Sequence, residues 1–377
     1  MESHRFRHRK GQAKAVFVAW RDLKFAKGRF ALMGTVIVLI TLLVGLLSGL
    51  TAGLGRQNTS AITGLPADKI AFQAPADGQD PSYANSSVTQ KQWQRWSEAP
   101  GVESAEPLGI TITRAMAGHH SIAVSLFGVQ TDSRLAPDSS KIDDESVVLS
   151  ATAADDLGVR TGDRLILAGR RLEVAAVRGD AYFSHTPVIW TSLTVWRKSA
   201  PPRSDGDGPT ATVVALSTTS KADVAATDRQ ADTKTVSTHD SLSAIGSYTS
   251  ENGSLQLMRG FLFAISALVI GAFFTVWTIQ RSGDVAVLKA LGASTADLLK
   301  DALGQAVVLL VGGTVIGTGV AAGLGALVAG SAVPFVLTAG TVLIPATVMI
   351  ALGVLGAALS IRRITSVDPL TALGSAR

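Results

Sequence analysis

The chain has 377 residues, of which 47% are hydrophobic and 17% are charged, with a formal net charge of +5. This composition is too apolar for an ordinary soluble protein, so a membrane protein is expected. The sequence contains no cysteine. That excludes zinc–thiolate sites, iron–sulfur clusters and disulfides, so any exported domain must be stabilised by its own apolar core.

The first 29 residues carry a strong excess of positive charge. Only Glu2 and Asp22 oppose nine basic residues, which are Arg5, Arg7, Arg9, Lys10, Lys14, Arg21, Lys24, Lys27 and Arg29. The positive-inside rule therefore predicts a cytoplasmic N-terminus, with residues 15–27 as a helix lying along the inner membrane surface. A nucleic-acid-binding arm is the alternative, but the long apolar run that follows favours the membrane.

Four apolar runs are long enough to cross about 30 Å of hydrocarbon at 1.5 Å per residue. The first, Phe30 to Gly55, is uncharged over 26 residues. A cleaved signal peptide is the alternative, but its hydrophobic region would span only about 7 to 15 residues. The predicted segments are 1–29 as a cytoplasmic amphipathic helix, 30–55 as a span, 56–259 as an outer domain, 260–280 as a span, 281–301 as a cytoplasmic segment, 302–328 as a span, 329–340 as an external turn, 341–361 as a span and 362–377 as a cytoplasmic tail.

The outer domain is polar sequence with short alternating apolar runs, which predict strands. The alternating residues are Ile110 and Ile112, then Ile122, Val124 and Leu126, then Leu165 and Leu167, and then Leu172 and Val174. Helices are predicted at Gln90 to Glu98 and at Ser150 to Leu157, and residues 168–170 can close a hairpin. The fold class is therefore an α-helical membrane protein with four transmembrane helices and an α+β extracytoplasmic domain between the first two.

The cytoplasmic segment between the second and third spans predicts a helix, a tight turn and a second helix. Asp284 to Leu291 is compatible with a helix that has one apolar side. Gly292 can supply a left-handed C-cap, and Ser294 with Asp297 forms a capping box for the next helix. This arrangement predicts an intracellular hinge.

The third span is rich in glycine at small-xxx-small spacing. Gly313 pairs with Gly317 in this pattern, and Gly319 pairs with Gly323. Such faces allow helices to approach closely, either within one chain or between subunits. In the fourth span, Pro345 is expected to kink the helix or to start it.

Several phrases resemble the FtsX/MacB-like ABC permeases, the type VII ABC transporters. These are DVAVLKALGAS, VTQKQWQRWSEAPGVESAEPL, VSLFGV, VVLSATAADDLGVRTGDRLILAGRRLEVAAV and the ending RRITSVDPLTALGSAR. The resemblance implies a MacB-like periplasmic core for the outer domain, a homodimer or close heterodimer, and an ABC ATPase on the cytoplasmic face. It also implies a coupling helix that contacts this ATPase through Asp284, Val285, Leu288, Lys289, Leu291 and Gly292.

The sequence has no phosphate loop, no nucleophile elbow and no H-E-x-x-H motif, so a non-catalytic subunit is expected. Two functions stay open: an exporter of an amphiphilic molecule, or an FtsX-like transmitter that controls an external cell-wall hydrolase. The size of the outer domain favours the exporter. A permease of this length without a fused ATPase resembles the haem-exporting HrtB branch, which implies haem as the cargo, with a lipid, lipoprotein, peptide or macrolide as alternatives.

Candidate substrate ligands cluster where the outer domain meets the spans. They are Tyr248, Glu251, Met258, Arg56 and Arg259, which could supply axial groups to haem iron or cations to its carboxylates. The alternative is that they mark the membrane interface. No histidine lies in a span, and His119 and His120 are expected to be solvated in a turn. No intrinsic cofactor, metal site or catalytic residue is predicted.

Overall fold

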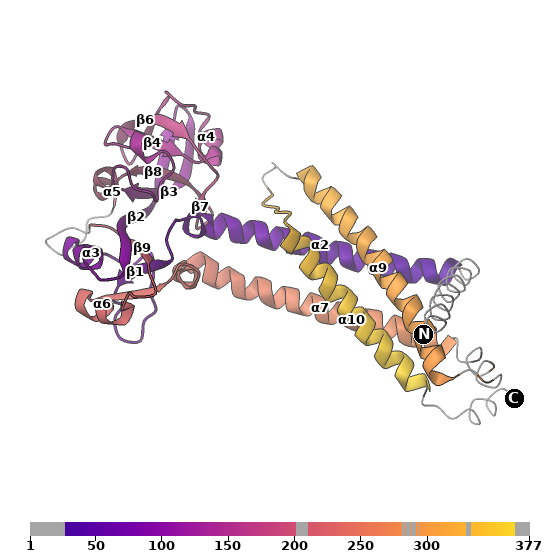
Figure 1. The fold of residues 1–377 in the computed structure, drawn as a ribbon. Helices are drawn as coiled ribbons and strands as arrows, with labels where there is room; N and C mark the ends of the chain where they lie inside the picture. Colours follow the sequence, from indigo (N-terminus) through magenta and orange to yellow (C-terminus); the bar gives the residue numbers. More distant parts are fainter. Residues whose placement is uncertain are drawn as a thin grey trace, which may run out of the picture. The chain divides into compact units, whose positions relative to one another are not determined.

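A computed structural model of the chain describes residues 27–200, 210–280, 283, 287, 292, 294–328 and 333–365. The chain divides into two compact units (Figure 1). We call Met1–Gly53 together with Leu255–Arg377 the membrane unit, and Leu54–Ser254 the inserted domain. The predicted N-terminal helix lies outside the described residues.

Four helices are long and apolar enough to cross a membrane. They are α2 (Lys27–Thr63), α7 (Gly246–Gln280), α9 (Thr295–Val328) and α10 (Ala339–Thr365). The prediction of four membrane helices is thus confirmed. Helices α2 and α7 are longer than their apolar runs, because helix-compatible polar sequence extends each of them into the inserted domain. Pro345 lies inside α10 rather than at its start.

One predicted glycine pair on α9 packs tightly against α2. A Cβ atom added at Gly313 would lie 2.7 Å from Ile37, and one at Gly317 would lie 2.6 Å from the Val38 carbonyl oxygen. The small-residue face therefore brings these two helices of one chain together. At Gly319 and Gly323 an added Cβ would meet no described atom within 4 Å.

The segment before α10 also packs on glycines. The ring of Phe335 lies where side chains at Gly49 of α2 and Gly325 of α9 would stand, and the Pro334 carbonyl lies against Gly53. In addition, the Val336 backbone N–H donates to the Gly49 carbonyl at 3.1 Å. These glycines are needed because bulkier residues would collide with the segment.

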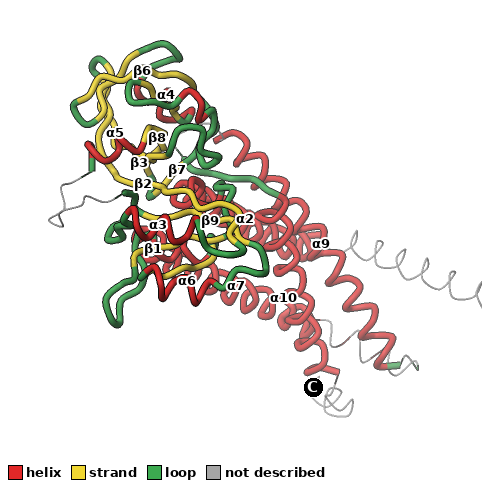
Figure 2. The backbone as a smooth tube through the Cα atoms, turned by 60° about the vertical axis from the view of Figure 1, so that its left-hand side comes forward, coloured by secondary structure: helices red, strands yellow, loops and turns green. Residues whose placement is uncertain are grey.

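The inserted domain is built on one sheet with strand order β10-β1-β9-β2-β3-β8-β4-β6-β5, and β7 pairs with β8 (Figures 1 and 2). The strands are β1 (Lys69–Gln73), β2 (Val102–Ala117), β3 (His120–Val129), β4 (Ser146–Leu149), β5 (Arg164–Leu167), β6 (Arg170–Val177), β7 (Tyr182–Phe183), β8 (Thr186–Ser192), β9 (Val213–Thr218) and β10 (Thr233–Ser237). The helices are α3 (Gln90–Ser97), η1 (Ser139–Lys141), α4 (Ala151–Leu157), α5 (Leu193–Ser199), α6 (Val224–Ala231) and η2 (Asp240–Ala244).

Strand β2 belongs to both halves of this sheet. Its first part, up to Leu108, pairs with β9, whereas Gly109–Ala117 pairs with β3. On the side where β9 ends, β5 takes over the edge of β2 only at Ala115. No described strand therefore covers this edge between Leu108 and Ala115, and a short stretch of β2 is open on one side.

The alternating apolar residues form strands as predicted, and their inward side chains fill the domain core. Val124 and Leu126 of β3 and Leu165 and Leu167 of β5 are buried in one cluster. Ile112 is the exception, since it is 53% exposed. The hairpin predicted between β5 and β6 is confirmed as well.

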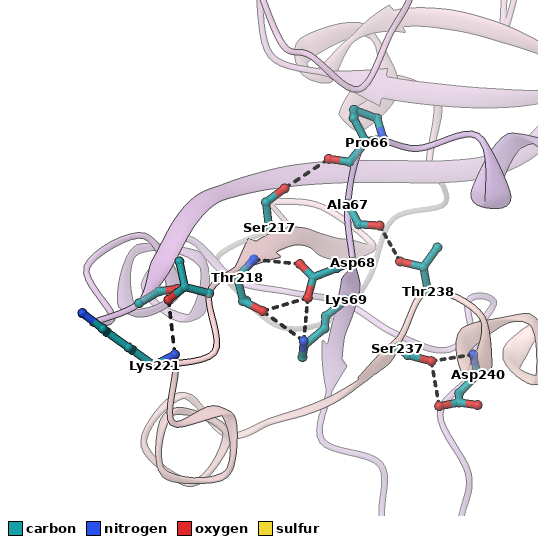
Figure 3. A network of polar contacts seen from close by, with 12 residues as sticks. Pro66, Ala67, Asp68, Lys69, Ser217, Thr218, Lys221, Ser237, Thr238 and Asp240 are labelled. Carbon is teal, nitrogen blue, oxygen red and sulfur yellow. Dashed lines mark hydrogen bonds and ion pairs between the residues drawn. The ribbon is translucent and has the colours of Figure 1, made fainter.

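A polar network fixes the position of β1 beside its two neighbours (Figure 3). Asp68 accepts hydrogen bonds from the backbone and hydroxyl of Thr218, the last residue of β9, both at 2.7 Å, and Lys69 Nζ lies 2.5 Å from the same carboxylate. Thr238 after β10 donates to the Ala67 carbonyl at 2.8 Å. Burial disfavours ionised Asp68, but the hydrogen bonds from Lys69 and Thr218 outweigh it, so the pKa of this carboxyl lies below its usual value.

Candidate functional site

A two-residue turn joins β7 to β8 and has an unusual backbone. Ser184 and His185 have φ angles of +50° and +63°. Two-residue hairpins of this type normally use Asn-Gly or Gly-Gly, because other side chains are disfavoured at positive φ. The Ser-His turn must therefore be held by its surroundings.

Helix α2 supplies part of that support. The backbone N–H groups of Ser184 and His185 donate to the carbonyls of Asn58 and Gln57, each at 3.0 Å. A carbonyl oxygen has two lone pairs, so a helix carbonyl can accept such a bond in addition to its own. Two consecutive donors thus fasten the turn to α2.

The side chains of the turn also contact α7. His185 Nε2 lies 2.9 Å from Glu251 Oε2, and Ser184 Oγ lies 2.9 Å from Ser247 Oγ. Ser247 in turn donates to Asn58 Oδ1 at 2.6 Å. We call these five residues, Asn58, Ser184, His185, Ser247 and Glu251, the turn cluster.

Proton placement follows from the chemistry of the acceptor. An ionised Glu251 can only accept, so His185 Nε2 carries the proton and donates to it. Asn58 Nδ2 lies 3.4 Å from the same carboxylate and 3.1 Å from His185 Nε2. Since both nitrogens are then donors, Asn58 bonds to the carboxylate and merely touches the imidazole. Two donors hold the Glu251 carboxylate in one orientation.

Solvent reaches this pair, because the side chains of His185 and Glu251 are 30% and 42% exposed. The contact between the two side chains therefore contributes little stability, on the order of 1 kcal/mol or less. The pair is of interest for its chemistry, because a carboxylate and an imidazole can both accept protons and bind metal ions. The described residues hold no group of three or more His, Cys, Asp or Glu that could enclose a metal ion.

The structure places the predicted substrate residues in different settings. Glu251 is in the turn cluster, and Tyr248 is half-buried against the core of the inserted domain. Arg56 is exposed on α2. Met258, 48% exposed, and Arg259 lie on α7 within the membrane unit. Arg259 Nε is buried and has no hydrogen-bond partner among the described residues.

Sequence reasoning missed His185. The signal was the two-residue gap between the apolar runs of β7 and β8, which is typical of a hairpin. Nothing in the sequence shows that this gap meets Asn58 and Glu251. His119 and His120 are both exposed, as predicted, although only His119 lies in the turn and His120 is the first residue of β3.

Most of the predicted coupling helix lies outside the described residues. This applies to Asp284, Val285, Leu288, Lys289 and Leu291. Gly292 is described, and its φ of +93° is the left-handed conformation that was predicted. Helix α9 begins directly after Ser294. The contact with an ATPase stays a prediction.

The model of the MacB-like periplasmic core domain matches residues 30–234, and that of the FtsX-like permease C-terminal domain matches residues 257–369. The chain belongs to the FtsX/MacB-like family of ABC transporter permeases. This confirms the predicted family and its α+β domain between the first and second membrane helices. The permease is thus a multi-pass membrane protein of an ABC transport system, and such a system includes a partner ATPase.

Two relatives match almost the whole permease. A hemin transport system permease protein, HrtB, of Staphylococcus haemolyticus is 26% identical over 95% of this chain and 99% of its own. An uncharacterized ABC transporter permease of Mycobacterium tuberculosis is 24% identical over the same shares. The periplasmic region of MacB from Actinobacillus actinomycetemcomitans aligns with 48% of this chain and 92% of its own, at 12% identity and a TM-score of 0.33.

Proposed function

We propose that this permease and a separate ATPase expel haem, or a similar flat amphiphile, from the membrane by ATP-driven conformational change. The observation that carries the proposal is the end-to-end similarity to a protein named as a hemin transport permease, with 95% of this chain and 99% of the relative aligned. Since the sequence lacks a phosphate-binding loop, ATP hydrolysis is assigned to the partner.

The proposed assembly is a dimer of the permease bound to an ATPase dimer. Both termini of each permease chain lie in the cytoplasm, and the inserted domain lies outside. This orientation rests on the nine basic residues before the first span. Closure of the ATPase is transmitted through the segment 284–292.

Glu251 is the proposed oxygen ligand of the iron, assisted by Tyr248 or Met258, and Arg56 and Arg259 are the proposed cations for the haem carboxylates. The geometry of Glu251 supports this role, because two donors orient its carboxylate while 42% of the side chain is exposed.

Haem titration of the full-length permease in lipid nanodiscs tests both the cargo and the ligands. We expect a saturable Soret band in the wild type that shifts or weakens in Glu251→Gln, Tyr248→Phe or Met258→Leu. Glu103→Gln, at an exposed position of β2, is the matched control. If the wild type binds no haem saturably, the cargo proposal fails. If all three variants have wild-type spectra, only the ligand assignment fails.

A further inference from the structure

The inserted domain contains a cavity of about 410 Å³ that lies beside the turn cluster and shares Ser184 with it. Ile110, Thr111 and Ile112 line it along the stretch of β2 whose edge is uncovered. Tyr83, Phe183 and Trp196 supply its aromatic walls. Its volume falls within the roughly 300 to 1,000 Å³ of small-molecule sites.

The local chain path explains why this space stays open. Thr212 stands just before β9 and uses its hydroxyl to accept from the Ile110 N–H at 2.8 Å and to donate to the Ile110 carbonyl at 3.1 Å. It thus occupies the edge of β2 that a strand would otherwise pair with. Neither β9 nor β5 reaches Ile112, the next residue on that edge, and its side chain is 53% exposed. The cavity occupies this gap.

The lining has rigid aromatic walls. Tyr83 and Phe183 pack edge to face with ring centroids 5.4 Å apart, and both are buried. Trp196 is only 3% exposed. Side chains at Gly109 and Gly128 would collide with Trp196, so these glycines leave room for its indole. The aromatic side chains are thus held in place by their neighbours and give the cavity a fixed apolar wall.

The lining contains no Asp, Glu, Lys, Arg or His. An ionised ligand would therefore lose water without gaining a counter-charge, which is costly. At the ~30 Å³ that a water molecule occupies, the cavity holds about fourteen groups of that size. These limits disfavour haem, whose carboxylates need cationic partners, and favour a smaller neutral molecule.

We propose that this cavity is a binding site for a neutral, mainly apolar molecule of about fourteen non-hydrogen atoms. The ligand lies between the aromatic walls and Ile112. The site is independent of the transported cargo. Its proposed occupant differs from haem in both charge and size.

Benzophenone is a suitable probe, because it is neutral and mainly apolar and photolabels neighbouring C–H bonds. The experiment uses the full-length permease in nanodiscs, with labelled positions mapped by mass spectrometry against benzophenone concentration. We expect saturable labelling of peptides that contain residues 83–86, 110–112 or 196–200. The matched probe 4-benzoylbenzoate adds a carboxylate to the same rings and should leave these peptides unlabelled.

Two variants of β2 separate the cavity from simple partitioning into lipid. Ile112→Trp should fill the opening and abolish the labelling, whereas Met116→Trp, an exposed position on the same face of β2, should retain it. Ala200→Phe fills the space from α5 and should repeat the loss.

Labelling confined to the membrane helices, or equal in Ile112→Trp, Ala200→Phe and Met116→Trp, would overturn the site. Equal labelling by 4-benzoylbenzoate would overturn its neutrality. None of these outcomes tests the haem proposal, which is tested by the Soret titration described above. Circular dichroism and size-exclusion profiles of each variant show that it is folded.

Discussion

At the scale of single residues, Asp68 is a carboxylate whose hydrogen bonds and ion pair form only in the folded chain. Its carboxylate lies directly before β1, accepts two hydrogen bonds from Thr218 of β9 and pairs with Lys69 of β1, as Figure 3 shows. The pKa of Asp68 is lowered in the folded state. A group of this kind stabilises the fold above its unfolded pKa of about 3.9 and loses that contribution as the pH falls through the folded value.

We therefore predict that Asp68→Asn lowers the free energy of unfolding at pH 7 by about 1 kcal/mol, since the site is partly solvated. The difference between wild type and variant should shrink as the pH falls below the unfolded pKa of about 3.9, because this stability is lost as the pH falls through the lowered folded pKa. Thermal unfolding of the purified permease at pH 7 and at a series of pH values from 4 downward measures this. Asp77→Asn, at an exposed position, is the control. A difference that persists unchanged at pH 3 would contradict the assignment.

His185 is a second residue whose role depends on its setting. It keeps a left-handed backbone because α2 binds its N–H and α7 binds its imidazole. We predict that His185→Phe weakens haem binding by the full-length permease severalfold, since Phe has no donor and Glu251 loses one of its two orienting donors. His119→Phe, exposed before β3, should bind as the wild type does. Equal Soret titrations for both variants would show that His185 does not position Glu251.

At the scale of elements, the contact between α2 and α9 depends on the absence of side chains. We predict that Gly317→Leu destabilises the permease by about 1 to 3 kcal/mol, because its Cβ would stand 2.6 Å from the Val38 carbonyl. Gly319→Leu on the same helix should be tolerated, since an added Cβ meets no described atom within 4 Å. Thermal unfolding of both variants in one detergent is the measurement. Equal melting temperatures would rule out the packing role.

The predicted coupling helix needs a functional test. Burying a Leu side chain in an ATPase groove contributes roughly 1.5 to 3 kcal/mol, whereas a charge there is costly. We predict that Leu288→Asp weakens co-purification with the ATPase and lowers its stimulated ATP turnover. Ser140→Asp in the inserted domain serves as the control. A Leu288→Asp permease that is folded and stimulates turnover like the control would refute the coupling role.

Periodicity explains which elements could be predicted. The membrane helices and the alternating strands each bury a repeating set of side chains, and that repeat is visible in the sequence. Phe335 has no such signal, because it packs on Gly49 and Gly325 as a single residue of an irregular segment. The same is true of the turn cluster, in which residues 58, 185 and 251 meet only through the tertiary fold. The cavity beside β2 likewise depends on where β9 and β5 end.

At the scale of the whole molecule, the four-span arrangement predicts which parts of the chain face the outside. The permease contains no cysteine, so single cysteines can report on position without background. We predict that Ser140→Cys in intact cells reacts with a membrane-impermeant thiol reagent, whereas Ser294→Cys reacts only after the membrane is opened. Both positions are solvent-exposed. The reverse pattern would invert the topology.

The strand order of the inserted domain has a consequence for how the chain folds as it crosses the membrane. Among the described strands, β1 pairs only with β9 and β10, the last two strands of the domain in sequence. Contacts between distant parts of a chain form slowly, because a long loop must close first. In the proposed orientation, β1 is the first strand to be exported, and it has no neighbour until the chain is delivered as far as Thr218. It gains its second neighbour only when the chain reaches Ser237. Until then its unpaired edges are open to aggregation, which favours rapid export of the whole domain.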